Sequence, residues 1–324
     1  MNPEAQILRK KVREKVRAAV FAQSAEPALP AFTRYFQERF GSELLAVILY
    51  GSCLSQVTRR ESSIYDFFLI CGRYRPFYRN WKLALFNYFL PPNIFYFELQ
   101  DPEAGRLAGK YSVTSLRDFR HETSPRARDT YHLGRFAKRV VISYTRDEKV
   151  REGLIDAILS AMEQNIALAL PFLPPRFQRD EFILTLLGMS YRGETRMDLD
   201  SKVEELFRAE AEYYRQCYAE LLRACLLENN LGSESDGGYS LPEKPRRRRF
   251  RLMKTRAFLF QTRIRTYLRW PKYIITFDNW LDYLLSKLER SKGIRLELTA
   301  RERKYPLIFC WKHFFRLKRA GKIK

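Results

Sequence analysis

One apolar, β-branched run, LLAVILYG at residues 44–51, restricts the fold of this chain more than any other segment. A short and uniformly apolar run is typical of a buried strand, and the glycine at its end indicates a tight turn. A second run, SIYDFFLIC at 63–71, is similar but carries one aspartate, Asp66. A third run, NIFYFEL at 93–99, follows a double proline. We therefore expect a sheet with covering helices within the first 120 residues.

Helical patterns dominate from about Asp129 onwards. Apolar residues recur at three and four in 153–173, in 181–191 and in one long stretch, 199–228. The segment at 229–245 is rich in Gly, Ser and Asn, which is typical of a linker. This pattern predicts an α+β fold. Its expected parts are a catalytic domain at 1–128, a helical domain at 129–228, the linker at 229–245 and a basic aromatic region at 246–324.

The positive charge of the chain is concentrated in its last quarter. Residues 241–324 hold 25 Lys and Arg against 6 Asp and Glu, a net +19 out of +22 for the whole chain. The remaining residues resemble a nearly neutral globular unit. A polycation with interspersed aromatic residues favours an anionic partner, either a membrane surface or nucleic acid.

Zinc sites, disulfides and membrane spans are not favoured. The five cysteines have no metal-ligand spacing and suit a reducing compartment, and the three histidines lie far apart. The N-terminus lacks the apolar stretch of a signal peptide and resembles a basic helix. No apolar window reaches the length of a membrane-spanning helix, since the best candidate carries Glu163 and ends at prolines. If the chain acts on a membrane, we expect it to act from the surface.

The segment LYGSCLSQVTRRESSIYDFFLI, at 49–70, contains the main candidate site. Gly51 permits a tight turn after the first strand, and Ser52 can face a phosphate there. Asp66, near the start of the next strand, is a candidate metal ligand. Nucleotidyl transfer needs such groups, because a triphosphate must be cradled and a divalent metal held. An ordinary turn before an ordinary strand is the alternative.

A second carboxylate for the metal must come from elsewhere in the chain. The usual nucleotidyltransferase signature has two aspartates with one residue between them, whereas Ile64 and Phe68 flank Asp66 at that spacing. Glu98, on the third strand, is the candidate for the second ligand. A solvated glutamate at a strand end is the alternative interpretation of Glu98.

Further motifs follow in order along the chain. They are AGKYSVTSL (108–116), YHLGRFAKRV (131–140), FLPPRFQRDEFILTLLGMSYRGETRM (172–197) and EYYRQCYAELL (212–222). With YGS and YDFFLI, they resemble the mitochondrial phosphatidate cytidylyltransferase family, also called the mitochondrial translocator assembly and maintenance proteins, over roughly residues 44–222. The matching residues are Tyr50-Gly51-Ser52, Asp66, Lys110-Tyr111, Gly134-Arg135 with Lys138, and Ser190-Tyr191 through Gly193-Glu194 to Arg196-Met197.

Three positions depart from the family pattern. Cys53 stands where the family usually has a second glycine, Glu194 where it commonly has aspartate, and Arg139 where it has proline. The loss of the glycine affects the expected shape of the phosphate loop. The absence of a second aspartate next to Asp66 is, by contrast, a feature of the family too.

The resemblance implies a reaction and a nucleotidyltransferase-like mixed sheet. CTP and phosphatidic acid would give CDP-diacylglycerol and pyrophosphate, assisted by Mg²⁺ or another divalent metal. Asp66 would hold the metal, with Glu98 as a weaker candidate. The remaining roles fall to catalytic cations, Lys110, Arg135 and Lys138, and to nucleotide-binding residues, Tyr50, Gly51, Ser52, Ser190, Tyr191 and Arg196. Without the resemblance, the three cations would be read as surface charges, Tyr191 as a core aromatic and Arg196 as a helix-end charge.

The basic C-terminal region is the candidate membrane contact. The expected contact residues are Arg246, Arg247, Arg248, Arg249, Trp270, Trp311, Phe314 and Phe315. Mixed cations and aromatics bind the headgroup region through charge while the rings insert. The alternative is a docked helical extension with core aromatics and solvated charges, and the two are compatible.

Two other functions remain open. A nucleotidyltransferase acting on RNA or another phosphorylated acceptor would also use a basic tail, although such RNA enzymes usually keep both strand aspartates. A non-catalytic relative is the third option. In the absence of a clear presequence, we expect the cytoplasmic face of a bacterial inner membrane, with the matrix side of the mitochondrial inner membrane as the alternative.

Overall fold

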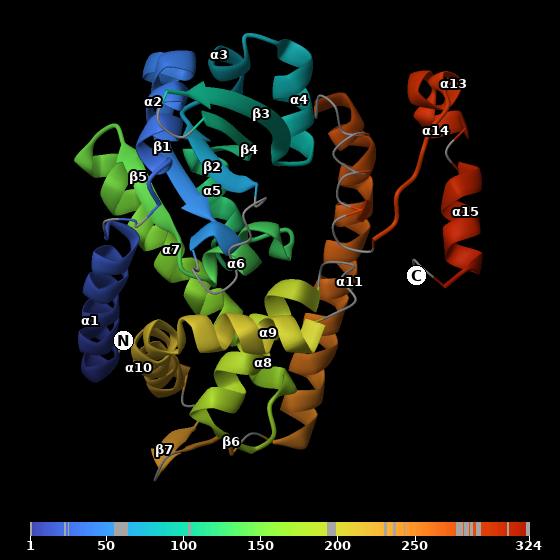
Figure 1. Cartoon of the computed structure of the whole chain (residues 1–324). Coiled ribbons are helices and arrows are strands. Elements are labelled where there is room, and N and C mark those ends of the chain that lie inside the picture. Colours follow the sequence, from blue (N-terminus) through green and yellow to red (C-terminus); the bar gives the residue numbers. More distant parts are fainter. Residues whose placement is uncertain are drawn as a thin grey trace.

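The structure is a computed structural model of the chain. It describes residues 2–321 except 23, 25, 55–63, 103–104, 193–198, 230–231, 236–237, 243, 277–280, 282–284, 286–287, 290–292 and 310. Figure 1 shows a sheet at the top, helices beneath it and one long helix along the side. The predicted α+β class is confirmed.

A mixed five-stranded sheet forms the upper part of the described molecule. Its strands are β1 (Leu44–Tyr50), β2 (Tyr65–Cys71), β3 (Asn93–Asp101), β4 (Gly105–Ser115) and β5 (Val141–Thr145), in the order β3-β4-β2-β1-β5. Only β2 and β4 run parallel among these neighbours, and the other pairs are antiparallel. The three strands expected first from the sequence are confirmed. β5, which lies inside the range expected to be helical, was not predicted.

Helices cover both faces of the sheet. From Ala46 onwards, even-numbered residues of β1, and those of β2 such as Phe68, join a large core with helices of the lower part of the molecule. Odd-numbered residues, such as Leu49 and Phe67, pack on the other face under Phe32 and neighbouring aromatics. This alternation follows from the period-two geometry of a strand, and it explains why the strands are apolar throughout.

Ten α-helices with described bounds precede the C-terminal region, and none is as long as the helix predicted at 199–228. They are α1 (Pro3–Val20), α2 (Leu29–Phe40), α3 (Tyr74–Tyr78), α4 (Trp81–Phe89), α5 (Leu116–Glu122), α6 (Thr130–Phe136), α7 (Glu148–Ala169), α8 (Arg179–Arg192), α9 (Leu199–Ala209) and α10 (Ala211–Asn229), with 3₁₀ turns η1 (Gly41–Glu43), η2 (Ser52–Leu54) and η3 (Leu170–Phe172). The single helix predicted at 199–228 is interrupted at Glu210, so it forms α9 and α10.

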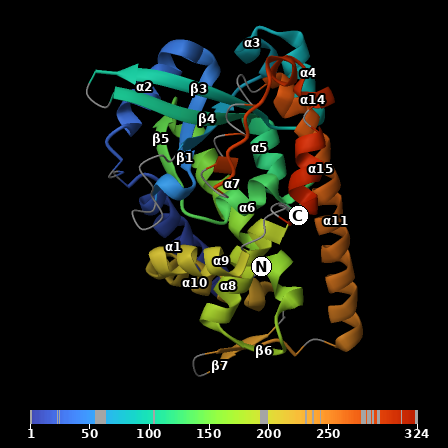
Figure 2. The ribbon, with the colours of Figure 1, turned by 45° about the vertical axis from the view of Figure 1, so that its right-hand side comes forward.

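The segment expected to be a linker takes part in a second, small sheet. β6 (Arg176–Gln178), β7 (Ser233–Ser235) and β8 (Gly238–Ser240) are arranged in the order β6-β8-β7. After it come the long α11 (Pro245–Thr276) and the short α13 (Ala300–Lys304), α14 (Pro306–Phe309) and α15 (Trp311–Arg319). In both ribbon views α11 lies along one side of the molecule (Figures 1 and 2).

The segment Glu148–Phe172, formed by α7 and η3, is long and apolar enough to cross a membrane, contrary to the sequence-based expectation. However, 61% of its apolar window is buried inside the molecule. Leu154, Ile158 and Met162 belong to the large core. This helix is therefore accounted for as the central core helix of the fold.

Candidate active site

Three strands bring a tyrosine, an aspartate and a lysine into one row. Tyr50 on β1 lies opposite Asp66 on β2, and Asp66 lies opposite Lys110 on β4. Because laterally paired residues share a face, all three side chains belong to the face of the sheet that also bears Phe68. The Lys110 Nζ lies 3.2 Å from Asp66 Oδ1, and both side chains keep partial access to solvent. The row thus contains a reachable carboxylate with a cation beside it.

The turn after β1 lies against the aspartate. Gly51 has a φ of 95°, in the region that favours glycine, and a Cβ on it would lie 3.3 Å from Asp66 Oδ2. The glycine thus allows the backbone to approach the carboxylate closely. Cys53, which replaces a family glycine, is buried in the opposite core, and its thiol donates to the Tyr50 carbonyl at 3.4 Å. Its side chain therefore packs in that core, where Asp66 is close enough to contribute to the raised pKa of the thiol after burial, the main cause.

Helix α6 carries the second cation toward the row. Arg135 Nη1 donates to the Tyr131 carbonyl at 2.8 Å, and its guanidinium lies 3.6 Å from the centre of the Tyr131 ring. The same guanidinium lies 5.8 Å from the Tyr50 ring. The Tyr131 hydroxyl is 3.1 Å from Ser112 Oγ on β4. These contacts place Arg135 next to the row and fix its direction.

The electrostatic environment of Tyr50 keeps its hydroxyl protonated. Burial raises the pKa of Tyr50 well above its ordinary value, with Tyr131 and Asp66 adding to the effect and Arg135 opposing it. Tyr50 can therefore donate a hydrogen bond but is not a base near neutral pH.

The Gly-Arg and Ser-Tyr motifs meet where α6 crosses α8. A Cβ on Gly134 would lie 3.0 Å from the Ser190 carbonyl oxygen and 3.1 Å from Ser190 Cα and Cβ. Ser190 is buried, and its hydroxyl donates to the Leu187 carbonyl at 2.7 Å. The contact brings the end of α8 to the helix that carries Arg135.

The residues that follow α6 are held by α10 and by Glu210, which precedes it. Arg139, where the resemblance leads us to expect a proline, has its Nη1 3.3 Å from Glu210 Oε1 at the break between α9 and α10. Tyr218 on α10 donates to the Ala137 carbonyl at 2.7 Å. Arg139 thus has an ion-pair partner in Glu210. Lys138, half-buried, lies in the turn between these two anchored positions.

A buried ion cluster behind α6 was missed by sequence reasoning. Asp129 caps α6 through the Tyr131 amide and accepts from Arg265 Nε at 2.7 Å and Arg269 Nη2 at 2.5 Å. Burial alone would raise the pKa of Asp129, but the arginines and the amide outweigh it and lower that pKa to about 2. The guanidinium of Arg269 also lies 5.0 Å from the Tyr131 ring. α11 therefore contributes to the support of the site.

Local sequence patterns could have indicated Tyr131 and Asp129. Tyr131 lies one helical turn before Arg135, and an aspartate before an apolar periodic segment is a capping signal. The two arginines had none, because their contacts with Asp129 join positions more than a hundred residues apart.

Glu98 is not brought to Asp66. It pairs with Ala108 on β4, one strand and two residues away from the row, and its carboxylate accepts from both Arg106 Nε and Nη2 at 3.1 and 2.8 Å. Tyr96 also donates to it at 2.7 Å. Its role as a metal ligand stays a prediction, without support from proximity.

Some predicted residues cannot be placed. Arg196, with Gly193, Glu194 and Met197, lies outside the described residues. The backbones of Ser52 and Tyr191 are described, in η2 and α8, but their side chains are not. The same holds for Trp270 in α11 and Phe314 in α15, whose backbones are described but whose side chains are not.

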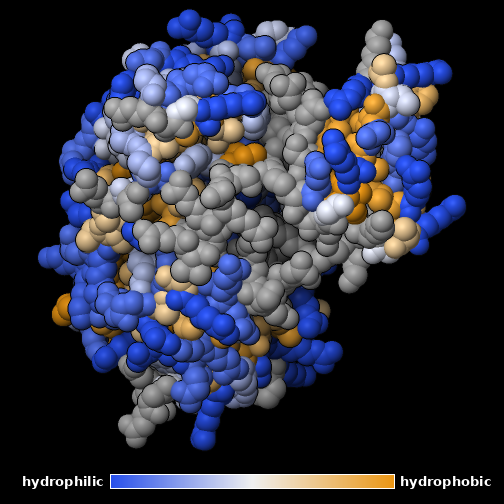
Figure 3. All heavy atoms as spheres, in the orientation of Figure 1, coloured by the Kyte–Doolittle hydropathy of each residue, from blue (hydrophilic) through white to orange (hydrophobic). Residues whose placement is uncertain are grey.

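The expected membrane-contact residues that are described lie mostly on the surface. Arg246, Arg247 and Arg249 are exposed, and so are Trp311 and Phe315 on α15. In Figure 3, hydrophobic side chains gather in the area of α11 and the C-terminal helices, among hydrophilic ones.

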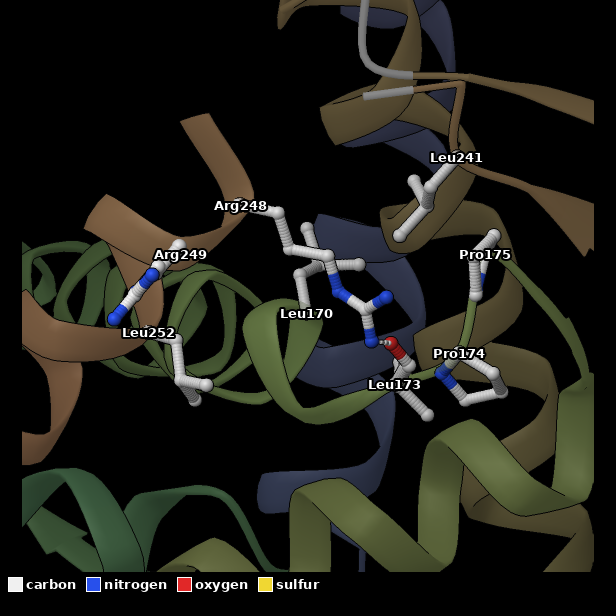
Figure 4. A pocket seen from close by; sticks show the side chains of 8 residues that line it. All are labelled: Leu170, Leu173, Pro174, Pro175, Leu241, Arg248, Arg249 and Leu252. Carbon is white, nitrogen blue, oxygen red and sulfur yellow. Dashed lines mark hydrogen bonds between the residues drawn. The ribbon is translucent and has the colours of Figure 1, made fainter. Parts of the chain in front are cut away.

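Arg248 instead turns inward and donates to the Leu173 carbonyl. It lines a pocket of about 320 Å³ together with Arg249 and mainly Leu and Pro side chains (Figure 4). None of the predicted catalytic residues lines this pocket.

The comparisons with known proteins bear on the central part of the chain. A family model described as mitochondrial phosphatidate cytidylyltransferase matches residues 92–256, just over half of the chain. The chain belongs to this family. The match includes Lys110, Arg135, Lys138 and Ser190, whereas Gly51 and Asp66 lie before it and Arg265 and Arg269 after it.

A curated relative gives a weaker likeness. The mitochondrial phosphatidate cytidylyltransferase of Xenopus laevis is 31% identical over 139 residues, which is 41% of this chain. The alignment spans 38% of that relative. Family membership therefore rests on the family model, while activity and substrates require their own argument.

The donor set fits a divalent cation only if phosphates complete it. Among the described residues, no three His, Cys, Asp or Glu side chains form a metal-binding group. Mg²⁺ is commonly held by one or two carboxylates together with phosphate oxygens and water. Asp66 beside the Gly51 turn is suited to that mode.

Proposed function

We propose that the protein transfers CMP from CTP to phosphatidic acid, giving CDP-diacylglycerol and pyrophosphate. One observation carries the proposal: Lys110 lies against Asp66. Lys110 is within the residues that match the family model, whereas Asp66 belongs to the segment that precedes the match. Family membership supplies the substrates, and the row beside a glycine turn supplies a place for a triphosphate.

The proposed chemistry is an in-line displacement. An oxygen of the lipid phosphate bonds to the α-phosphorus of CTP, the bond to the bridging oxygen breaks, and pyrophosphate leaves with that electron pair. Lys110 and Arg135 would hold the negative charge that grows on the leaving group. The Gly51–Ser52 turn would cradle the phosphates, and Tyr50 would donate to one of them.

A divalent cation, Mg²⁺ in the simplest case, would be held by Asp66 and phosphate oxygens and would supply charge neutralisation and orientation of the phosphates. Lys110 would then exchange its bond with Asp66 for a phosphate oxygen. The roles of Lys138, Ser190, Tyr191 and Arg196 in binding nucleotide or lipid phosphate are part of the same proposal.

We also propose that the reaction takes place at an anionic membrane surface. The exposed arginines at 246, 247 and 249 and the exposed Trp311 and Phe315 support a contact through the C-terminal region. Each basic residue near such a surface contributes about 1 kcal/mol. The Xenopus laevis relative is named as mitochondrial, which favours the mitochondrial alternative over a bacterial inner membrane.

The proposal is tested by pyrophosphate release from the purified chain in mixed micelles. CTP, ATP, GTP and UTP are compared, with and without phosphatidic acid and Mg²⁺. We expect release that requires CTP, phosphatidic acid and the metal together. Release that requires RNA instead of lipid would favour an RNA nucleotidyltransferase, and no release with any nucleotide would indicate a non-catalytic relative.

A further inference from the structure

Helix α4 has the reverse of the usual polarity of a surface helix. Its most exposed side chains are large and apolar: Trp81 is 64% exposed, Leu85 46%, Tyr88 55% and Phe89 66%. The residue of this helix that is fully buried is a polar one, Asn87. A helix of a soluble surface normally buries its apolar residues and exposes its polar ones.

Hydrogen bonds, together with the packing of Ala84, hold α4 to the sheet. Asn87 Nδ2 donates to the Val113 carbonyl on β4 at 2.9 Å, and its Oδ1 accepts from the Asn93 amide. Asn93 Nδ2 donates in turn to the Leu83 carbonyl at 2.9 Å. The orientation of the helix is therefore specified, and its outward apolar face is a defined feature of the fold.

The surroundings of this face are basic. No Asp or Glu occurs from residue 67 to residue 97, a stretch that the structure describes throughout. Arg73, Arg75, Arg79 and Lys82, just before and within α4, are all exposed. Lys82 Nζ lies 5.9 Å from the centre of the Trp81 ring. Exposed aromatic rings with cations nearby in the chain and no carboxylate in the same stretch complement an anionic lipid surface.

The C-terminal end of α11 joins the same surface. Lys272 donates to the Leu90 carbonyl and lies 3.5 Å from the Phe86 carbonyl, and Arg269 Nε donates to the Pro91 carbonyl at 3.0 Å. Close to these contacts, Tyr267 and Leu268 are 57% and 60% exposed. Both ribbon views show α4 beside this end of α11 (Figures 1 and 2).

We propose that the outward face of α4, defined by Trp81, Leu85, Tyr88 and Phe89, inserts into the interfacial region of an anionic phospholipid bilayer. This deepens the proposed function, on which it rests for the choice of a lipid surface. Val113, which anchors α4, lies three residues after Lys110 on β4, about 10 Å along the strand. Insertion of α4 would thus bring the row to the level of lipid phosphates.

The test compares binding of full-length variants to sedimenting vesicles. The probes are vesicles of phosphatidylcholine alone and of phosphatidylcholine with phosphatidylserine. The double variant Trp81→Ser, Phe89→Ser removes the face, and Ile7→Ser on α1, at a residue that is 69% exposed, is the matched control. We expect the affinity for phosphatidylserine vesicles to fall at least about tenfold in the double variant and to stay within about twofold in the control.

A second measurement follows the fluorescence of the Trp81 indole. Brominated lipids quench tryptophans that enter the bilayer, so Trp81→Phe should remove part of the quenching that the native chain shows. The proposal is overturned if the double variant binds vesicles as the native chain does, or if Trp81→Phe leaves the quenching unchanged. A dimer in solution that the double variant dissociates would likewise overturn it, in favour of a second copy as the occupant.

Turnover of a short-chain, water-soluble phosphatidic acid separates this inference from the proposed function. The double variant should retain that turnover, because its substitutions lie outside the row. Loss of vesicle binding with soluble turnover retained supports the inference. A native chain that binds vesicles through α4 but shows no turnover leaves the inference standing and contradicts the proposed function.

Discussion

At the scale of single residues, the candidate site depends on how closely the Gly51 backbone approaches the Asp66 carboxylate. The left-handed φ of 95° costs an alanine about 1–2 kcal/mol, and its Cβ would meet Asp66 Oδ2 at 3.3 Å. We expect Gly51→Ala to lower kcat at least about tenfold. Gly72→Ala is the control, because a Cβ there meets nothing within 4 Å. Equal activities of the two variants would contradict the role of the turn.

Substitutions of Asp66 and Glu98, two carboxylates with different surroundings, test which of them is the metal ligand. Asp66→Asn removes the charge next to Lys110 and should lower kcat at least about 100-fold. Glu98→Gln removes the negative charge opposite Arg106 at the exposed edge and should leave kcat within about threefold. Titration of activity with Mg²⁺ is the measurement. A large loss for Glu98→Gln would restore Glu98 as the second ligand.

Sequence reasoning found the residues of the row but not which strands lie next to one another. Glycine before a loop and a lone aspartate in an apolar strand are local signals, and they indicated Gly51 and Asp66. Which strands are neighbours is decided by long-range pairing, and the parallel pairing of β2 with β4 is what places Lys110 beside Asp66. The same pairing leaves Glu98 beside Arg106.

At the scale of elements, the crossing of α6 and α8 depends on Gly134. A methyl group there would lie 3.0–3.1 Å from the backbone of Ser190, which must move to accommodate it. We expect Gly134→Ala to destabilise the fold by about 1–3 kcal/mol and to lower activity through Arg135. Chemical denaturation and kcat are measured together.

Gly188, on α8, supplies the control for that substitution. A Cβ on Gly188 meets nothing within 4 Å, so Gly188→Ala should be neutral or stabilise by up to about 1 kcal/mol. If both alanine variants behave alike, the close packing of α6 on α8 is contradicted.

The end of α11 gives the free energy of unfolding a pH dependence. Burial, with Arg269 and Arg265 nearby, lowers the pKa of Lys272 to about 6, whereas a lysine in the unfolded chain titrates near pH ~10.4. Between these values the unfolded state holds the proton that the folded state has released. The free energy of unfolding therefore rises with pH there, by at most about 1.4 kcal/mol per pH unit.

Lys272→Met should flatten this rise, and Lys254→Met, at an exposed lysine on the same helix, should not. Denaturant unfolding at about pH 6.5 and about pH 8.5 measures the difference. A native chain with the same stability at both values would show that Lys272 remains charged in the fold.

Element boundaries were predictable where the pattern was local. The apolar runs of β1, β2 and β3 and the periodicity of α7 and α8 were recognised. The break at Glu210 coincides with an ion pair to the distant Arg139, which no local pattern indicates, and β5 is too short to stand out from the helices around it. The small sheet at β6–β8 needs pairing across 176–240.

At the scale of the whole molecule, the basic C-terminal region has two faces. Its inner face, with Arg265, Arg269 and Lys272, is fastened to the body, and its outer face exposes Phe260, Tyr267 and other apolar residues among arginines. The sequence allowed either a docked extension or a surface contact. The structure shows the docking, and the outer faces of α11 and α4 are what a membrane would meet.

The most direct measurement of the central claim follows the phosphorus atoms. CTP labelled at the α-phosphorus and CTP labelled at the γ-phosphorus are each incubated with the native chain, Mg²⁺ and phosphatidic acid, and the lipid is extracted. We predict that the α label enters the lipid as CDP-diacylglycerol, that the γ label is recovered from the water phase as pyrophosphate, and that Asp66→Asn forms neither product. Consumption of CTP without entry of the α label into the lipid, or entry of the γ label into the lipid, would contradict the account.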